Sequence, residues 1–336
     1  MIRAALGPLL LTPLLVTPLL VFAGCAHPAP PSGYVDLHNS GLAWVLDAEP
    51  SAVDAQLVEW KAANTAMLVL SLGQASFPLG ETHPVKPAAL PSMMKRARRL
   101  LANGPPWVGA IEGGSLLVAD ARWLQELSAS GVRIVGFGHH RHDQWIEPAR
   151  PPEIRGPSPV DDSSRLSAAG RRLVTLLNGA GFVVDLAHLG RTAFAQTVEL
   201  LDGRPLLVSH TGARALCDSP RNLSDAHARQ VAKSGGLVGV IFHSPLLRCD
   251  GTPATVDDVA SHIEHFVSIM GPAHVALGTD WRGRTRPPED LRRPGDLGRL
   301  ESALMRRGMP AAEIQGVLYG NAARWLGLNA PALTNR

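Results

Sequence analysis

The chain has 336 residues, of which 45% are hydrophobic, and a formal net charge of +3. This length and apolar content provide for a sizeable core in one or two domains. Arginine supplies nearly all of the positive charge, and no basic run contains interleaved aromatic residues, which argues against nucleic acid as a partner.

The N-terminal segment has the layout of an export signal. Arg3 precedes an apolar stretch over residues 9–21, and small residues stand directly before Cys25. We predict a lipoprotein signal peptide over residues 1–25, with Cys25 lipidated, on an exported protein anchored to the periplasmic or cell-surface side of a membrane. The alternative is an ordinary signal peptide that happens to contain a cysteine. The proline-containing residues 26–33 then form a tether, and residues 34–330 form the folded domain.

Eight short apolar runs are spread along the folded domain, with helical patterns between them. The runs cover residues 34–37, 66–72, 107–111, 132–138, 182–187, 205–209, 236–242 and 275–279. Apolar residues spaced three and four apart predict helices over residues 51–64, 91–103, 119–130, 163–178, 191–201, 224–233, 255–270, 294–307 and 311–326. Alternating strands and helices indicate an α/β fold with a parallel sheet, and eight such units over about 300 residues predict a (β/α)8 TIM-like barrel.

Two kinds of signal refine the element boundaries. Thr255 with Asp258 three residues later is a helix-starting capping box, and glycines at 131, 181, 271 and 308 stand just past predicted helix ends. The proline- and arginine-rich stretches 147–159 and 282–294 are predicted loops over one end of the barrel.

Most of the apolar runs end on a side chain that can bind a metal or move a proton. In a (β/α)8 barrel the C-terminal ends of the strands meet at one mouth, where the active site is built. Glu112, His188 and His210 each follow a run, and two histidines with one glutamate form a known catalytic zinc set with an open fourth position. Such a metal activates a water, and Asp280, after the last run, is placed to take its proton.

With these residues in view, the chain resembles the membrane dipeptidase (renal dipeptidase) family of metallopeptidases. The order and spacing of the matching segments hold from about residue 34 to 328, and together they are highly specific. The segments are Val35-Asp36-Leu37-His38-Asn39, Ile111-Glu112-Gly113-Gly114, Val183-Val184-Asp185-Leu186-Ala187-His188, Ser209-His210, Arg221-Asn222-Leu223-Ser224-Asp225, Gly235-Gly236-Leu237-Val238-Gly239-Val240, Gly278-Thr279-Asp280 and Gly320-Asn321-Ala322-Ala323-Arg324.

The resemblance implies a metal-dependent barrel hydrolase that holds two zinc ions and acts on dipeptides, with relatives that suggest a homodimer. His38 would ligate the first metal, Glu112 would bridge both, and His188 and His210 would complete the second. His139 would bind the substrate and stabilise the tetrahedral oxyanion. Arg221 would hold the free carboxylate of a dipeptide, and Asp280 would shuttle the proton.

The sequence departs from the family pattern at two positions, Ser40 and Arg282. The first family motif has an aspartate on the first metal where this chain has Ser40, so we expect that metal to bind weakly or not at all. Arg282 replaces a second aspartate after Asp280, and a cation there can pair with Asp280 and lower its pKa. Residues 140–143 also carry more charge than the family pattern, and one of them can replace the missing ligand.

Three hypotheses follow for the function. We prefer a zinc dipeptidase, with one or two Zn²⁺ per chain, that cleaves small dipeptide-like substrates. The alternatives are a catalytically weakened or inactive lipid-anchored binding protein on the same fold, and a hydrolase whose substrate has shifted to a lactone or modified amide.

Two cysteines, Cys217 and Cys249, remain beyond the signal segment. They can pair in an exported protein, but the favoured interpretation is that each is a small buried apolar residue.

Overall fold

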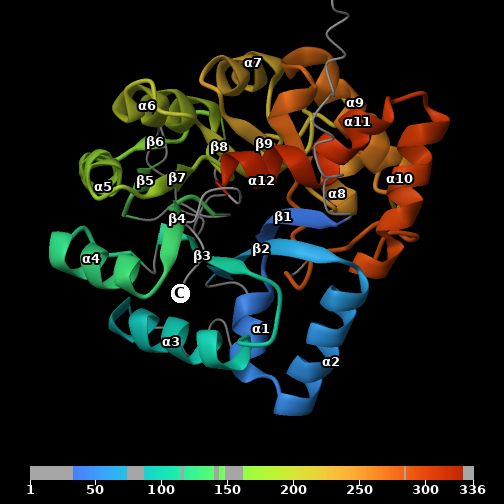
Figure 1. The fold of residues 1–336 in the computed structure, drawn as a ribbon. Helices are drawn as coiled ribbons and strands as arrows, with labels where there is room; N and C mark the ends of the chain where they lie inside the picture. Colours follow the sequence, from blue (N-terminus) through green and yellow to red (C-terminus); the bar gives the residue numbers. More distant parts are fainter. Residues whose placement is uncertain are drawn as a thin grey trace, which may run out of the picture. The chain divides into compact units, whose positions relative to one another are not determined.

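Eight parallel strands close into a barrel in the computed structural model (Figure 1). The structure describes residues 33–73, 87–114, 117–139, 144–147, 162–283 and 285–327, all within one compact unit. The barrel order is β1-β10-β9-β8-β7-β4-β3-β2. The strands are β1 (Tyr34–Asn39), β2 (Thr65–Gly73), β3 (Trp107–Glu112), β4 (Val132–Gly136), β7 (Val183–Asp185), β8 (Leu207–Thr211), β9 (Leu237–Val240) and β10 (Val275–Leu277). The predicted (β/α)8 barrel is confirmed, and each strand coincides with one apolar run.

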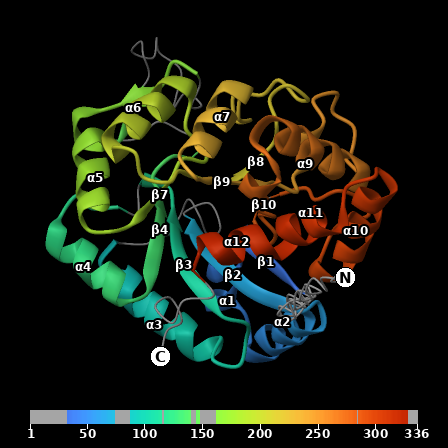
Figure 2. The same cartoon turned by 45° about the horizontal axis from the view of Figure 1, so that its top comes forward.

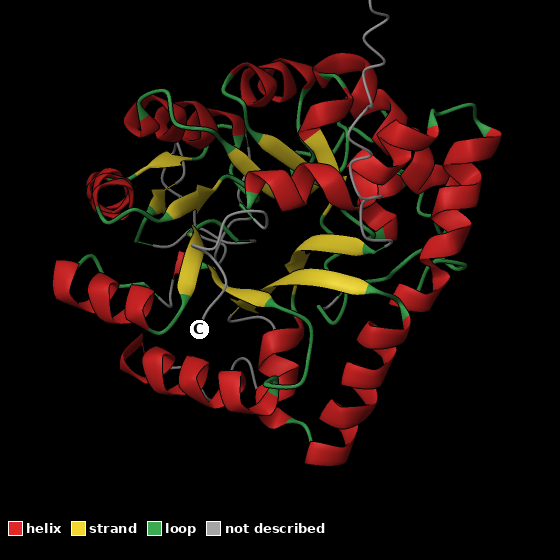
Figure 3. Cartoon of the chain, viewed as in Figure 1, coloured by secondary structure: helices red, strands yellow, loops and turns green. Residues whose placement is uncertain are grey.

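The described residues form helices that mostly lie outside the ring of strands, as Figures 2 and 3 show. They are α1 (Gly41–Asp47), α2 (Pro50–Ala62), α3 (Leu90–Leu100), α4 (Ala121–Ala129), α5 (Ala168–Gly179), α6 (Arg191–Leu201), α7 (Asp225–Lys233), α8 (Ser244–Leu247), α9 (Val256–Met270), α10 (Leu297–Arg306), α11 (Ala311–Gln315) and α12 (Asn321–Trp325). In this part of the chain, no helix has the length and apolar content needed to cross a bilayer.

The strand side chains alternate between two apolar clusters. On β2, Leu68, Leu70 and Leu72 pack toward the surrounding helices, whereas Met67 and Val69 belong to the cluster inside the barrel. Both sets are buried, which is why these strands read as continuous apolar runs in the sequence.

The short helix α12 packs against the interior of the barrel at the end where the strands begin. Its residues Ala322, Ala323 and Leu326, the last just after the helix, join the interior cluster with Val35 and Met67. Figure 2 shows α12 lying across the strands. The helix therefore fills the lower end of the barrel, and the strand C-termini form the opposite end.

The structure corrects the predicted helix over residues 163–178. Its first residues instead contribute β6 (Arg165–Leu166), which pairs antiparallel with β5 (Ile146–Glu147). Helix α5 begins after Ser167, whose hydroxyl accepts a hydrogen bond from Gly170 N at 3.0 Å. The predicted helix 311–326 is likewise divided, by a π-helical turn over Gly316–Gly320.

Other boundary predictions are confirmed. Asp258 accepts a hydrogen bond from Thr255 N at 2.8 Å at the start of α9, and Gly271 after its end has φ +83°, a conformation that costs glycine little. The predicted signal peptide, most of the tether, residues 140–143 and residues 148–161 lie outside the described residues.

Cys217 and Cys249 form a disulfide, so the favoured interpretation of two unpaired apolar residues is wrong. Their Cα atoms lie 5.2 Å apart, within the range a disulfide requires. The bond joins the segment between β8 and α7 to the segment between α8 and α9. Two cysteines 32 residues apart carry no spacing signal for pairing, and only the fold brings them together.

Removing this disulfide is expected to destabilise the protein by about 3–4 kcal/mol, because the cross-link no longer limits the conformational entropy of the unfolded chain. The Cys217→Ala/Cys249→Ala double variant and the wild type should be compared by urea unfolding, with the free energy in water obtained from the m-value of each protein. Reduced wild-type protein is the control, because it lacks the cross-link but keeps both sulfur atoms and their packing. An unchanged free energy of unfolding would contradict a stabilising role for the bond.

Candidate active site

The strand C-termini bring four predicted ligands into one buried cluster. His38 lies near the end of β1, Glu112 is the last residue of β3, His188 follows β7, and His210 lies in β8. His188 Nε2 and His210 Nε2 lie 3.0 Å and 3.3 Å from Glu112 Oε1, and 3.0 Å from each other. His38 Nε2 lies 3.6 Å from Glu112 Oε2. Residues separated by up to 172 positions thus lie together in one buried cluster.

The geometry of Glu112, His188 and His210 fits a tetrahedral metal. With metal–ligand bonds of about 2.1 Å, neighbouring ligand atoms of a tetrahedron stand roughly 3.4 Å apart. The three distances in the cluster, 3.0 to 3.3 Å, are close to that edge length. A second set that could hold a cation consists of His38, Asp185 and His210.

The charges of the cluster also suit a cation. Burial is the largest influence on His188 and His210, and it holds the pKa of each well below its usual value, so both rings are neutral. Burial alone would raise the pKa of Glu112, but the charge of His38 and a hydrogen bond from His188 outweigh it and hold the pKa well below its usual range. Two neutral imidazoles and a carboxylate are the forms that metal binding requires.

Ser40 lies where the sequence placed it, beside His38. Its hydroxyl donates a hydrogen bond to Asp280 Oδ1 at 2.7 Å and lies 3.4 Å from His38 Nε2. Asp280 Oδ1 is itself 3.7 Å from His38 Nε2. On this side of His38 the chain therefore offers a neutral hydroxyl, which is a weaker cation ligand than a carboxylate.

Arg282 does not pair with Asp280 as the sequence led us to expect. Its guanidinium donates a hydrogen bond to Gln56 and lies 3.9 Å from Glu59, both on α2. Burial raises the pKa of Asp280 to about 6, with His38 opposing this and Glu112 adding to it. The Arg282 guanidinium thus lies at α2, away from the mouth. The Asp280 carboxyl is a weaker acid than usual.

Three non-glycine residues at the mouth have left-handed backbones. His188, Asp280 and Arg282 have φ values of +66°, +56° and +69°. Such conformations cost about 1–3 kcal/mol each and persist where the surrounding structure enforces them. They turn His188 and Asp280 toward the cluster and Arg282 toward α2.

Arg221 lies beside the histidines on the segment between β8 and α7. Its Nη2 donates to His210 O at 3.0 Å, and its Nε is buried without a hydrogen-bond partner in the described residues. Burial lowers the pKa of Arg221 to about 10, against the pull of nearby carboxylates, so the side chain stays charged at neutral pH. An unused charged donor beside the cluster is suited to an anionic ligand.

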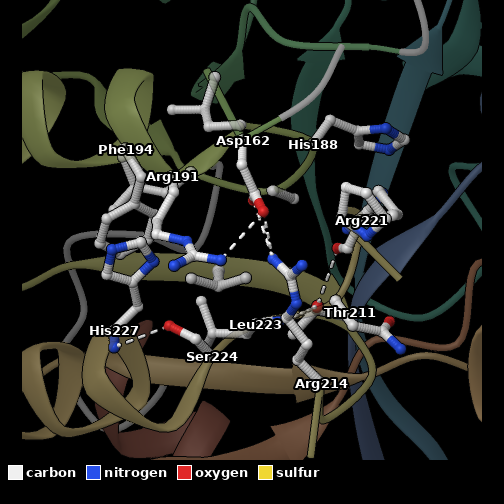
Figure 4. Close-up of a pocket in the computed structure, with 16 residues that line it drawn as sticks. Asp162, His188, Arg191, Phe194, Thr211, Arg214, Arg221, Leu223, Ser224 and His227 are labelled. Carbon is white, nitrogen blue, oxygen red and sulfur yellow. Dashed lines mark hydrogen bonds and ion pairs between the residues drawn. The ribbon is translucent and has the colours of Figure 1, made fainter. Parts of the chain in front are cut away.

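An ion-pair network fixes the Arg221 segment from outside. Asp162 accepts hydrogen bonds from Arg214 at 2.7 and 2.8 Å and from Arg191 at 3.0 Å, as Figure 4 shows. Arg214 stands on the same segment as Arg221. The pocket drawn there is lined by His188 and Arg221 as well as by this network.

His139, after β4, stacks on His188 with ring centroids 4.9 Å apart. Burial lowers its pKa, so the ring is neutral and can donate a hydrogen bond. By contrast His243, after β9, accepts a hydrogen bond from Arg286 N at 2.9 Å and belongs to neither potential metal set.

A family model described as membrane dipeptidase (peptidase family M19) matches residues 94–330. The chain belongs to the membrane dipeptidase family. The resemblance stated from the sequence motifs is thereby confirmed, and with it a metallopeptidase fold whose potential metal ligands are those described above.

Several relatives of this dipeptidase family match the chain. A Klebsiella pneumoniae protein described as an uncharacterized protein in the pqqA 5' region is 34% identical over 232 residues, 65% of this chain and 80% of that protein. Dipeptidase aclJ of Aspergillus oryzae is 30% identical over 218 residues, 65% of this chain and 50% of that protein. Dipeptidase 3 of Rattus norvegicus is 31% identical over 214 residues, 64% of this chain and 43% of that protein. The match therefore spans half or less of the two dipeptidases.

Solved structures agree on the fold. A metallopeptidase from Rhodobacter sphaeroides, liganded with a phosphinate mimic of the dipeptide L-Ala-D-Ala, superposes with a TM-score of 0.68 at 22% identity, covering 89% of this chain and 99% of that one. The probable dipeptidase PvdM from Pseudomonas aeruginosa gives 0.63 at 20% identity, covering 81% and 87%. At these identities the likeness concerns the barrel alone.

The sequence interpretation missed two pairs of buried residues behind the dipeptidase cluster. Asp36 accepts hydrogen bonds from Thr279 N at 2.8 Å and Thr279 Oγ1 at 2.6 Å. Asp185 accepts from Ser209 N at 2.9 Å and from the Ser209 hydroxyl. Each aspartate precedes a site histidine by two or three residues at a strand end, and this repeated spacing is the signal that could have found both.

Proposed function

We propose that the protein is a zinc dipeptidase that hydrolyses the peptide bond of dipeptides with a free C-terminal carboxylate. The observation that carries the proposal is the set of tetrahedral-edge distances among Glu112, His188 and His210. Membership of the membrane dipeptidase family supports the same reaction class. Zinc bound there would lower the pKa of a water molecule to about 7 and polarise the peptide carbonyl.

Asp280 is the proposed proton carrier. Its raised pKa, about 6, leaves the carboxylate ionised at neutral pH and able to accept a proton from the attacking water. The resulting carboxylic acid is then positioned to protonate the leaving amine. The hydrogen bond from Ser40 holds Asp280 Oδ1 toward His38, which fixes the carboxyl at the cluster.

Two further side chains are proposed to bind the substrate. Arg221 offers its unpaired Nε–H to the C-terminal carboxylate, a charged hydrogen bond in a largely dry site. The neutral ring of His139, stacked on His188, is proposed to donate to the oxyanion that forms on the former carbonyl oxygen.

The proposal is tested by assaying zinc-loaded protein on matched substrates. We expect turnover of L-L or L-D dipeptides and a large loss of kcat/KM for the corresponding dipeptide amides, which lack the anion that Arg221 would bind. Zinc content is measured on the same sample. Bound zinc without turnover of any dipeptide, or no retained divalent metal, would instead favour a binding protein on this fold.

We further propose that the chain binds one zinc firmly, because Ser40 replaces a carboxylate beside His38. The Ser40→Asp variant is expected to raise the zinc stoichiometry from about one toward two per chain, since a carboxylate would join His38 and Glu112 as ligands. Elemental analysis after dialysis measures this directly, with Ser40→Ala as the control that removes the hydroxyl without adding charge. A stoichiometry unchanged by the aspartate would contradict the placement of Ser40 beside a metal position.

The N-terminal sequence supports a lipid anchor at Cys25 on an exported protein, and the disulfide suits an oxidising compartment. We expect Cys25→Ala to abolish incorporation of labelled palmitate and to release the protein from the membrane fraction, whereas Cys217→Ala should leave labelling intact. Retained labelling in Cys25→Ala would rule out this anchor.

A further inference from the structure

One hydroxyl lies behind two of the proposed zinc ligands. Ser209 Oγ stands 2.7 Å from His210 Nδ1 and 3.3 Å from His38 Nδ1, and it is hydrogen-bonded to Asp185 Oδ2. All four residues are at most 5% exposed, so bulk water has little access to these hydrogen bonds.

The direction of these hydrogen bonds follows from counting protons. The second oxygen of Asp185, Oδ1, accepts from Ser209 N at 2.9 Å and Ala187 N at 3.0 Å. Its Oδ2 has the serine hydroxyl as its hydrogen-bond partner, and a carboxylate is a stronger acceptor than a ring nitrogen. The single hydroxyl proton therefore goes to Asp185. The two lone pairs of Ser209 Oγ remain, and they can only accept.

Both histidines must then donate from Nδ1. The neutral ring of His210 carries one proton, so with Nδ1–H it presents a lone pair at Nε2, the atom that faces the cluster. His38 must likewise release any proton on Nε2 to bind zinc through that atom, and its remaining proton then lies on Nδ1. His210 Nε2 is 3.3 Å from Glu112 Oε1, and His38 Nε2 is 3.6 Å from Glu112 Oε2. These are the atoms that would contact a metal.

We infer that Ser209 and Asp185 are positioning residues that hold His38 and His210 as Nδ1–H tautomers and thereby prepare both Nε2 atoms for zinc. The inference rests on the proposed function for the identity of the metal. The Ser209 hydroxyl is the partner of both His38 and His210, so its removal would affect both ligands.

The neighbouring strands are built around this serine. A Cβ atom at Gly239 or Gly278 would lie 2.0 or 1.9 Å from the carbonyl oxygen of Ser209, closer than atoms can approach. Glycine at these two positions allows β9 and the end of β10 to pack directly on the Ser209 backbone. The hydroxyl is therefore held at a fixed place between the two rings.

The decisive variant is Asp185→Asn, which keeps the shape of the side chain. The amide oxygen must face the two backbone N–H groups, so the amide nitrogen faces Ser209 and donates to it. The hydroxyl proton is then forced onto the Nδ1 side of His38 or His210, and that ring must carry its proton on Nε2. We expect zinc affinity to fall about 10- to 100-fold, the usual effect of losing a partner of a metal ligand. Ser209→Ala should change it in the same direction.

Thr197→Val is the matched control. Thr197 is fully buried on α6, and its hydroxyl donates to Ala193 O at 2.8 Å. The Thr197→Val substitution removes a buried hydroxyl at nearly constant side-chain volume, and this side chain does not contact the cluster. Zinc affinity of this control, measured by chelator competition, should equal that of the wild type, and thermal unfolding of all zinc-free variants shows whether each is folded.

Nitrogen-15 spectra of the histidine rings in zinc-free protein give a readout that packing alone would not move. We expect the proton of His210 on Nδ1 in the wild type, and loss of Nδ1–H at His210 or His38 in Asp185→Asn. An Nε2–H tautomer of wild-type His210, or a folded Asp185→Asn with wild-type tautomers and zinc affinity, would overturn the inference. Neither result depends on substrate turnover, so a protein that binds zinc in this way but cleaves no dipeptide would refute only the proposed function.

Discussion

Replacing Glu112 by alanine is expected to abolish both zinc retention and dipeptide turnover. Glu112 is the only carboxylate in the tetrahedral set with His188 and His210, and each histidine contacts the same oxygen. Without the metal, the attacking water keeps a pKa near 15.7 instead of about 7. We expect kcat/KM to fall by at least about 10⁴-fold, measured together with zinc content. His210→Ala should behave alike.

Glu126→Ala provides the control for Glu112, because Glu126 is an exposed glutamate on α4. It should retain wild-type zinc content and turnover. A Glu112→Ala protein that remains folded and hydrolyses dipeptides at the wild-type rate would refute the assigned site. If zinc were lost but turnover retained, the reaction would need another centre.

Asp280→Asn should separate proton transfer from metal binding. The amide preserves the shape of the side chain and can still accept the hydrogen bond from Ser40, but it cannot take up a proton. We expect kcat to fall about 10²- to 10⁴-fold, the usual contribution of a general base, while zinc content stays unchanged. Steady-state kinetics and elemental analysis on one preparation measure both quantities.

The control for Asp280 is Asp202→Asn. Asp202 is exposed at the end of α6 and has a left-handed backbone with φ +46°, a conformation that asparagine also adopts readily. Wild-type kinetics are expected for this variant. Loss of zinc in Asp280→Asn would instead mean that Asp280 serves as a ligand and not as the proton carrier.

The strands and the grouping of the candidate ligands could be read from the sequence because both depend on local pattern. Strands buried on two faces give unbroken apolar runs, and a barrel carries the residues after each run to one mouth. The two-residue strands β5 and β6 are too short to show any alternation, so a helix was predicted to begin at residue 163, where the chain in fact forms β6 and then α5.

Features that depend on long-range geometry could not be read in this way. Arg282 follows Asp280 by two residues, which suggested an ion pair between them. Its left-handed backbone instead directs the side chain to Gln56, 226 residues away in sequence. The pairing of Cys217 with Cys249 and the role of Ser209 likewise depend on which strands are neighbours. The sequence identifies the side chains that carry reactive groups. Which of them are in contact depends on the arrangement of the strands in the barrel.

The packing of α12 into the lower end of the barrel has a kinetic consequence. The interior at that end is filled by Ala322, Ala323 and Leu326. In the described part of the chain, small molecules therefore reach and leave the cluster through the mouth. Under the proposed function, both amino acids released from a dipeptide would then depart by the route along which the next substrate arrives. Slow release of either one would make the enzyme prone to inhibition by its own products, competitively with substrate.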